Sequence, residues 1–244
     1  CGSGIFLEEA FAYLQDYCVQ WYICNGQTDH LIETGIDLYK LPLQEKKDIL
    51  CSCIYGIDID IHAVEVAKFS LLIKLIEDET APSVSEVVPI LPDLGDNIQF
   101  GNSLVSQTEL NGISGANHQM MEIAPFDWST INNGCGFDVI IGNPPYVNTE
   151  GMHALLPSAE VEVYKKKYKT SHKQFDKYFI FIEQAINKIN ENGLVCYIVP
   201  NKFFKIGAGE KLRNLIAKER MLVSLDDFGD AQLFEDKTIY SSII

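Results

Sequence analysis

The chain has 244 residues, of which 47% are hydrophobic and 22% are charged, a balance typical of a globular protein with a sizeable core. No apolar run approaches the roughly 20 residues that span a bilayer, which excludes a transmembrane helix. The formal net charge of −15 argues at first against nucleic acid as a partner, because acidic proteins repel phosphates.

The charge is unevenly distributed along the chain. Residues 1–150 contain five lysines, no arginine and 22 acidic residues, whereas residues 151–244 contain 14 basic and 12 acidic residues. The densest basic cluster, residues 165–167, is flanked by Tyr164 and Tyr168. Taken alone, such a cluster is most often a solvated face of a helix or loop. On an acidic protein it is also what a single surface that meets a phosphate backbone would present.

The seven cysteines form no pattern that would bind a metal or build a disulfide framework. Their number is odd, and no Cys-x-x-Cys pair occurs. We therefore expect no metal site, and we expect a protein of a reducing compartment, the cytoplasm.

The first element in chain order is a glycine-containing turn at residues 2–4. Glycine lacks a Cβ atom, so the backbone of such a turn can approach a ligand closely. In open α/β domains a turn of this kind follows the first strand of the sheet. Here that strand is missing, and we therefore expect the chain to be a fragment of a longer protein.

Short apolar runs alternate with helical patterns, which predicts a mostly parallel α/β sheet with helices on both faces and an antiparallel hairpin at the C-terminal end. The predicted strands are residues 49–57, 98–100, 137–141, 194–199, 221–225 and 238–244. Helical spacing predicts three helices. The first contains Val64, Ala67, Leu71 and Leu75, and the third contains Leu212, Leu215 and Ile216. The second contains Phe179, Ile182, Ile186 and Ile189 and is predicted to stop at Asn192-Gly193. Residues 77–97 predict a long loop and residues 105–135 a long insertion.

An acidic residue, Asp58, ends the predicted strand 49–57. An acid in this position can accept hydrogen bonds from ribose hydroxyls; alternatively, it serves as the N-cap of the following helix. Together with the glycine turn, Asp58 favours a cofactor of the adenosine type. The full dinucleotide-binding pattern is not met, because Leu7 stands where its third glycine would fall.

The strongest signal is Asn143-Pro144-Pro145-Tyr146, which follows the predicted strand 137–141. The prolines fix φ and restrict Asn143 to an extended geometry. The Asn143 amide and the Pro144 carbonyl then become rigid acceptors that can hold an NH2 group. Hydrogen bonds from both N–H groups favour a pyramidal nitrogen whose lone pair can attack a methyl group, and Tyr146 offers a π face for a planar substrate. This step needs neither a proton-abstracting base nor a metal.

The order of these motifs resembles that of the γ-class DNA N6-adenine methyltransferases, above all those fused to or paired with restriction nucleases in type IIS and IIG systems. The resemblance is carried by residues 1–4, Gly56-Ile57-Asp58, Gly101-Asn102-Ser103-Leu104, residues 142–146 and Pro200-Asn201-Lys202-Phe203-Phe204. The family's motif Asp-Pro-Ala-Cys-Gly-Ser-Gly begins just before this chain, which fits a missing first strand. The resemblance implies a Rossmann-like methyltransferase catalytic domain over residues 1–244, with S-adenosylmethionine as cofactor and double-stranded DNA as substrate.

The resemblance also implies a set of cofactor-binding residues, namely Cys1, Gly2, Gly4, Asp58, Ile59, Asn102 and Ser103. The first three would line the methionine end of S-adenosylmethionine, Asp58 its ribose and Ile59 its adenine. Asn102, with Ser103, would face the edge of the same adenine. Many relatives have Asp at the position of Asn102, so the contact to the adenine amino group would rest here on a neutral acceptor.

For the substrate, the resemblance implies that residues 143–146 hold the target adenine. Within residues 233–237, Phe234 would pack against the base and Lys237 would lie near its backbone. A base inside a duplex cannot reach such a pocket. The target is therefore expected to be flipped out, at a cost of a few kcal/mol of unstacking.

Phosphate contacts near the flipped base are expected from the basic cluster Lys165, Lys166 and Lys167, which follows the loop 143–146. Base sequence is read by a separate recognition module, which we expect to lie outside the 244 residues. We therefore expect DNA binding through the full-length protein, with recognition and nuclease domains either attached or separate.

Three alternatives remain open. Protein-glutamine and RNA methyltransferases use the same Asn-Pro-Pro-Tyr loop, although the insertion 105–135 and the segment 233–237 match the DNA enzymes better. A methyltransferase-like scaffold without turnover would only position partner domains, and the intact loop argues against it. Residues 143–146 could also form a simple strand-ending turn with a surface aromatic.

Overall fold

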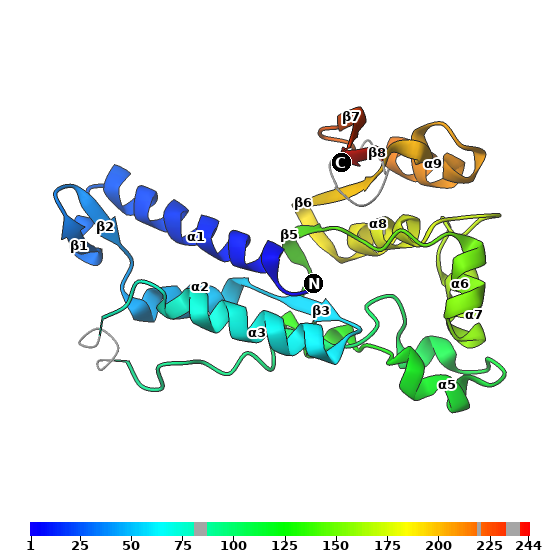
Figure 1. Ribbon diagram of the computed structural model, residues 1–244, viewed down its shortest axis with the longest axis horizontal. Helices are drawn as coiled ribbons and strands as arrows, with labels where there is room; N and C mark the ends of the chain where they lie inside the picture. Colours follow the sequence, from blue (N-terminus) through cyan, green and yellow to red (C-terminus); the bar gives the residue numbers. More distant parts are fainter. Residues whose placement is uncertain (81–86, 219–220, 233–239) are drawn as a thin grey trace. The chain divides into compact units, whose positions relative to one another are not determined.

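The computed structural model contains two compact units, each with its own hydrophobic core (Figure 1). The residues that it describes are 1–80, 87–218, 221–232 and 240–244. The first unit comprises residues 1–101 and 129–133, and the second comprises residues 102–128 and 134–244. Within the described ranges, no helix has the length and apolar character needed to cross a membrane.

Three helices build most of the first unit, α1 (Ile5–Cys24), α2 (Leu43–Cys53) and α3 (Ile61–Ile76). The helix predicted from Val64, Ala67, Leu71 and Leu75 is confirmed as α3, and all four side chains are at most 1% exposed. Phe11 of α1 is fully buried in the same core. The helical spacing of the apolar residues therefore fixes which face of α3 turns inward.

Two pairs of strands complete the first unit. The parallel pair is β3 (Gly56–Asp58) with β4 (Ile98–Phe100), and the antiparallel pair is β1 (Ile32–Gly35) with β2 (Leu38–Lys40), after the 3-10 turn η1 (Thr28–His30). In the parallel pair Asp58 lies opposite Phe100, so both strands end at the same edge. The strand predicted for residues 98–100 is confirmed, whereas no sequence pattern indicates the β1–β2 hairpin.

The strand predicted for residues 49–57 is wrong over most of its length. Its first half belongs to α2, and its strand is limited to β3. The buried residues of α2, Leu43, Lys46 and Leu50, recur at helical spacing. A short apolar run does not by itself distinguish a helix from a strand. Here the residues before the run already form the first turns of α2, and the run continues that helix.

The second unit contains a four-stranded sheet in the order β5, β6, β8, β7 (Figure 1). The strands are β5 (Phe137–Gly142), β6 (Ile189–Pro200), β7 (Asp226–Gln232) and β8 (Tyr240–Ile243). β5 and β6 are parallel, whereas β8 is antiparallel to both β6 and β7. The predicted α/β class and the antiparallel C-terminal hairpin are confirmed, but the sheet of this unit is mixed rather than mostly parallel.

The helices of the second unit are α5 (Ala116–Ile123), α6 (Thr149–Leu155), α7 (Ser158–Lys167), α8 (Lys177–Lys188) and α9 (Glu210–Lys218). Its short 3-10 turns are η2 (Gln107–Leu110), η5 (Asn201–Phe204) and η6 (Gly207–Gly209), whereas η3 (Trp128–Thr130) and η4 (Asn132–Gly134) lie mostly in residues 129–133 of the first unit. The predicted insertion 105–135 is therefore built of short helical segments. The helix predicted from Leu212, Leu215 and Ile216 is confirmed as α9.

The helix predicted to stop at Asn192-Gly193 ends earlier, at Lys188. β6 already begins at Ile189, which pairs with Phe137 of β5. Asn192 has a positive φ of 68° inside this strand, so the Asn-Gly signal marks an irregularity in β6 rather than the end of a helix.

The strand predicted for residues 221–225 does not form. These residues are exposed, and β7 begins only at Asp226, where Ile243 of β8 is its partner. Apolar side chains favour a strand only where a neighbouring strand satisfies the backbone. The predicted strand 238–244 is described from Tyr240 onward and agrees with β8 there.

Asn97 provides a test of how the end of α2 is fixed. Its buried side-chain amide donates to the carbonyls of Cys51 at 2.8 Å and Ile54 at 3.0 Å. The substitution Asn97→Ala leaves two carbonyls without this donor in a place that water reaches poorly. We expect it to lower the free energy of unfolding by about 2–3 kcal/mol, measured by urea denaturation.

The matched control is Asn25→Ala at the end of α1. Asn25 donates to the Trp21 carbonyl at 2.7 Å, but this contact is exposed and water can replace it. We expect a loss below about 0.5 kcal/mol. Equal losses for the two variants would show that Asn97 does not hold the end of α2.

Candidate functional site

The glycine turn at the start of the chain requires glycine at two positions. Gly2 and Gly4 have φ values of 58° and 95°, in the left-handed region that other residues rarely adopt. The carbonyl of Gly4 accepts from Leu7 and Glu8, which starts α1. A Cβ atom on Gly4 would lie 3.0 Å from the Cα and Cβ atoms of Ala67 in α3. The turn therefore packs too closely on α3 for any larger residue.

Asp58 closes this turn from the end of β3. Its Oδ2 atom accepts from the nitrogens of Gly2 at 2.7 Å and Cys1 at 2.8 Å, and its Oδ1 atom accepts from the Asp60 nitrogen at 2.9 Å. Burial alone would raise the pKa of Asp58, but the contact with the positively charged Cys1 ammonium and the hydrogen bonds from Asp60 and Gly2 outweigh it, and the pKa lies below its usual value. The carboxylate is therefore ionised at neutral pH.

The N-cap of α3 is Asp60, not Asp58. The Asp60 side chain accepts from the His62 nitrogen at 2.9 Å, as an N-cap does. Asp60 therefore has the helix-capping role that was the alternative for Asp58, and the Asp58 side chain bonds to the glycine turn instead. Ile59, between the two acids, is 46% exposed and offers apolar surface beside Asp58.

In the second unit, residues 143–146 leave β5 as an irregular loop. The Asn143 side chain is exposed and Pro144 is buried. The Tyr146 hydroxyl donates to the Asn143 Oδ1 atom and lies 3.0 Å from the Ile198 carbonyl of β6. Burial raises the pKa of Tyr146 to about 12, so this hydroxyl keeps its proton at neutral pH.

The segment after the loop is fixed by the start of α8. The Lys177 nitrogen donates to the Val147 carbonyl at 2.8 Å, and the Thr149 hydroxyl donates to the Phe175 carbonyl at 2.8 Å. The ring of Tyr178 packs edge-on against that of Tyr146, with 6.0 Å between their centroids. The start of α8 and the residue before its N-cap therefore hold the chain just after the loop, and Tyr178 packs against the loop's aromatic ring.

Asn102 and Ser103 form a buried turn after β4. Asn102 is 4% exposed, and both ends of its amide have partners within the second unit. Its Oδ1 atom accepts from the Leu104 nitrogen at 3.1 Å, and its Nδ2 atom donates to Glu160 at 3.0 Å. The carbonyl of Ser103 accepts from the Trp128 ring nitrogen at 3.1 Å. This turn is rigid, and its predicted contact with a cofactor remains a prediction.

The three lysines of the predicted basic cluster differ in their surroundings. Lys165 and Lys166 are exposed; Lys166 pairs with Glu162 of the same helix at 2.6 Å. Lys167 instead pairs with Glu109 at 2.9 Å and donates to the Leu104 carbonyl at 3.0 Å. Lys167 therefore holds the second unit together, which its place in a run of lysines did not indicate.

The remaining two predicted site residues, Phe234 and Lys237, lie outside the described residues. Sequence reasoning also missed residues that support the loop. Lys177 and Tyr178 contact it or the residue after it, Asp176 forms a backbone bridge with Asn148, and Glu160 faces the Lys177 ammonium at 3.6 Å. Asp176 could have been found, because an acid before an apolar helical pattern is an N-cap signal. No local pattern indicates that Glu160 is buried.

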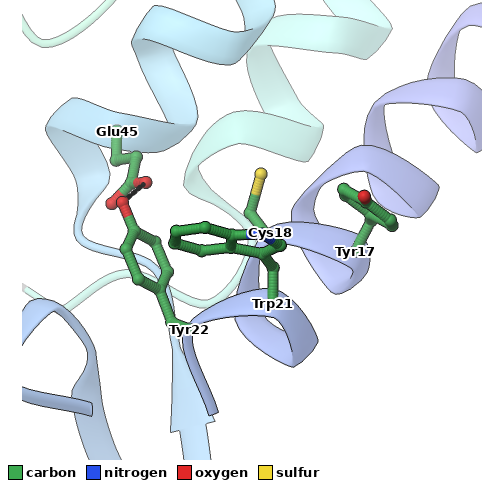
Figure 2. Close-up of a pocket in the computed structure, with 5 residues that line it drawn as sticks. All are labelled: Tyr17, Cys18, Trp21, Tyr22 and Glu45. Atoms are coloured by element: carbon green, nitrogen blue, oxygen red, sulfur yellow. Dashed lines mark hydrogen bonds between the residues drawn. The ribbon is translucent and has the colours of Figure 1, made fainter. Parts of the chain in front are cut away.

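A pocket of about 210 Å³ lies at the other end of α1 from the glycine turn (Figure 2). Its lining residues are Tyr17, Cys18, Trp21 and Tyr22 of α1 and Glu45 of α2. At 1.5 Å of rise per residue, it lies about 20 Å along the helix from the turn. None of the predicted site residues lines it, so this pocket is separate from the candidate site.

The model of the family described as Eco57I restriction-modification methylase matches residues 52–234, which include Asp58, the turn after β4 and the loop after β5. The chain belongs to the Eco57I restriction-modification methylase family. The predicted relation to the methyltransferases of restriction-modification systems is thereby confirmed at the level of the family.

Two relatives of this family member are long proteins. The chain is 43% identical over 244 residues to the type II restriction enzyme and methyltransferase RM.Eco57I of Escherichia coli, and covers 23% of that protein. It is 25% identical over 245 residues to the type II methyltransferase M.BstVI of Geobacillus stearothermophilus, and covers 35% of it. The chain therefore spans about a quarter to a third of these relatives.

A solved structure supports the fold of this family member. The M protein of the type I restriction enzyme EcoKI matches 99% of the chain with a TM-score of 0.52 and 15% sequence identity, and the chain covers 37% of it. At this level of identity the likeness concerns the fold alone.

Gly4 provides a test of the turn. The substitution Gly4→Ala places a Cβ atom against the backbone of Ala67 and also requires a left-handed φ. Gly26→Ala requires a left-handed φ of 67° with nothing within 4 Å of the new Cβ atom. We expect Gly26→Ala to lower the free energy of unfolding by about 1 kcal/mol, and Gly4→Ala by about 1–3 kcal/mol more.

Urea denaturation of both variants measures the difference. Because the two positions share the strain in φ, their difference isolates the contact with α3. A loss at Gly4 no greater than the loss at Gly26 would contradict close packing of the turn.

Proposed function

We propose that the chain is the catalytic part of an S-adenosylmethionine-dependent DNA methyltransferase that modifies the N6 atom of adenine in a restriction-modification system. The observation that carries the proposal is the loop 143–146, whose exposed Asn143 side chain lies at the end of β5 in a backbone fixed by two prolines. Membership of a restriction-modification methylase family supports DNA as the substrate class.

The glycine turn and Asp58 fit S-adenosylmethionine, which supplies the methyl group when bound. A carboxylate has about four acceptor positions, and Asp58 uses three of them, two on the backbone nitrogens of Gly2 and Asp60 and one on the Cys1 ammonium. One position is therefore left for a ribose hydroxyl. A Cβ atom on Gly2 would meet nothing within 4 Å, so open space adjoins the turn on the side proposed for the methionine end.

Asn143 and Pro144 would hold the amino group of the target adenine. The Asn143 Oδ1 atom has two lone pairs, of which the Tyr146 hydroxyl uses one. Within the described residues, no hydrogen bond reaches the Pro144 carbonyl. Two acceptors thus remain for the two N–H groups of an adenine amino group. Tyr146, half-buried against Tyr178, would offer one face of its ring to the base.

Among the cations proposed to meet the phosphate backbone, Lys165 and Lys166 are exposed in the structure, whereas Lys167 is engaged by Glu109. We therefore assign phosphate contacts to Lys165 and Lys166 first. Phe234 and Lys237 remain proposed partners of the flipped base. Recognition and nuclease functions would belong to other parts of the full-length protein, attached or separate.

The substitution Asn143→Ala tests the proposal. It removes one of the two acceptors proposed for the amino group, and we expect the rate of methyl transfer to fall at least about 100-fold. The affinity for S-adenosylmethionine should stay unchanged, because Asp58 and the glycine turn are untouched. The measurement uses the full-length protein, labelled cofactor and unmethylated DNA, with RNA and protein substrates in parallel.

Asn190→Ala is the matched control. Asn190 lies at the opposite end of β6, where its amide donates to Asp138 at 2.9 Å, and its loss should leave transfer within about twofold. Label in RNA or in protein glutamine, but not in DNA, would overturn the proposal. Cofactor binding without transfer to any substrate would indicate a scaffold.

A further inference from the structure

Glu160 of α7 is a buried carboxylate to which the proposed function gives no role. Its side chain is 1% exposed. A charge in such a place is costly unless donors surround it, and apolar replacement of a buried ion pair often leaves stability unchanged. Stability alone therefore does not explain why a carboxylate stands here.

Three donors from different segments converge on the Oε1 atom of Glu160. Asn102 donates its Nδ2 group at 3.0 Å, Tyr164 donates its hydroxyl, and the Lys177 ammonium lies 3.6 Å away. Burial lowers the pKa of Lys177, and the Glu160 carboxylate opposes this shift. Burial, followed by the same carboxylate, raises the pKa of Tyr164, so its hydroxyl remains a donor.

One of these donors, Asn102, is itself a predicted site residue, and another, Lys177, lies in the helix that holds the loop 143–146. Asn102 begins the turn after β4, and Lys177 begins α8. The backbone nitrogen of Lys177 donates to the Val147 carbonyl, directly after Tyr146, while its side-chain ammonium faces Glu160. Ligands of open α/β sheets bind where strands end. Glu160 thus joins the turn that follows β4 to the loop that follows β5.

We propose that Glu160 is a positioning residue for methyl transfer, which fixes the amide of Asn102 on one side and, through Lys177, the base-binding loop on the other. The inference rests on the proposed function. Leu104 donates to the oxygen end of the Asn102 amide, and a carboxylate accepts only from the nitrogen end. The two contacts together allow one orientation of this amide. Small displacements of such groups lower transfer rates strongly.

Two double variants of the full-length protein separate the two links. Glu160→Met with Lys177→Met removes both charges and the acceptor. Glu160→Gln with Lys177→Met also removes both charges but keeps an oxygen for Asn102 and Tyr164. Neither variant leaves an unpaired buried charge, so both should fold. Affinity for S-adenosylmethionine is measured by calorimetry, and kcat is measured with unmethylated DNA.

We expect the Met/Met variant to bind S-adenosylmethionine about tenfold more weakly, the equivalent of one lost hydrogen bond. The Gln/Met variant should bind it within about twofold of the wild type, because the Asn102 contact is kept. Both should show a kcat reduced severalfold, since both lose the link to Lys177. If Glu160 had a purely structural role, the two variants would not differ in cofactor affinity while sharing a reduced kcat.

Glu183→Ala is the control for stability. Glu183 is also buried, and it accepts from the nitrogens of Lys169 and Thr170 at 3.0 and 2.9 Å without contacting the turn after β4. Its loss should lower the melting temperature and leave cofactor affinity and kcat unchanged well below that temperature. Thermal unfolding is recorded for every variant.

Equal cofactor affinity in the wild type and both double variants would overturn the inference, as would losses that follow melting temperature across all variants, Glu183→Ala included. A wild type that binds S-adenosylmethionine but methylates no DNA would overturn the proposed function while the comparison of cofactor affinities still decides the role of Glu160 toward Asn102. A wild type that binds no S-adenosylmethionine would overturn both.

Discussion

The second unit depends on the way in which two consecutive prolines end β5. Pro144 and Pro145 donate no backbone hydrogen bond and hold φ near one value, so the chain cannot continue its ladder with β6. It leaves the sheet instead, with the Asn143 side chain at the strand end. Tyr146 then turns back and bonds to Asn143 and to the Ile198 carbonyl of β6. In the first unit the backbone is constrained instead by positive φ values. Glycine is the residue that adopts them readily, so it forms the turn that Asp58 closes.

Electrostatics in this chain are decided by individual pairs rather than by the net charge of −15. The positively charged Cys1 ammonium and backbone hydrogen bonds keep the pKa of Asp58 below its usual value, so this carboxylate stays available as an acceptor. In the second unit several cations are used inside the protein: Lys167 pairs with Glu109, Lys177 with Glu160 and Lys202 with Asp176. A run of lysines therefore overstates the charge that faces a partner, and exposure decides which of them can meet a phosphate.

Sequence reasoning located the elements that have a strong local signal. The helical spacing of α3, the strands β4 and β5 and the loop 143–146 all follow from patterns a few residues long. It failed where contacts with residues far away in the sequence determine the structure. α2 is a helix because Leu43 and Leu50 share one buried face. β6 starts earlier than predicted because Ile189 pairs with β5. Glu160 stands in a charged stretch and looks solvated, yet partners 58 and 17 residues away bury it. Such contacts leave no trace in a local pattern.

The central claim is that the loop after β5 presents its acceptors to the exocyclic amino group of adenine. The most direct test is to modify unmethylated DNA with the full-length protein and labelled S-adenosylmethionine, digest it to nucleosides and identify the labelled species by mass spectrometry. The account predicts that all label is in N6-methyladenine. Label in a methylated cytosine, or in a carbon-methylated base, would contradict it.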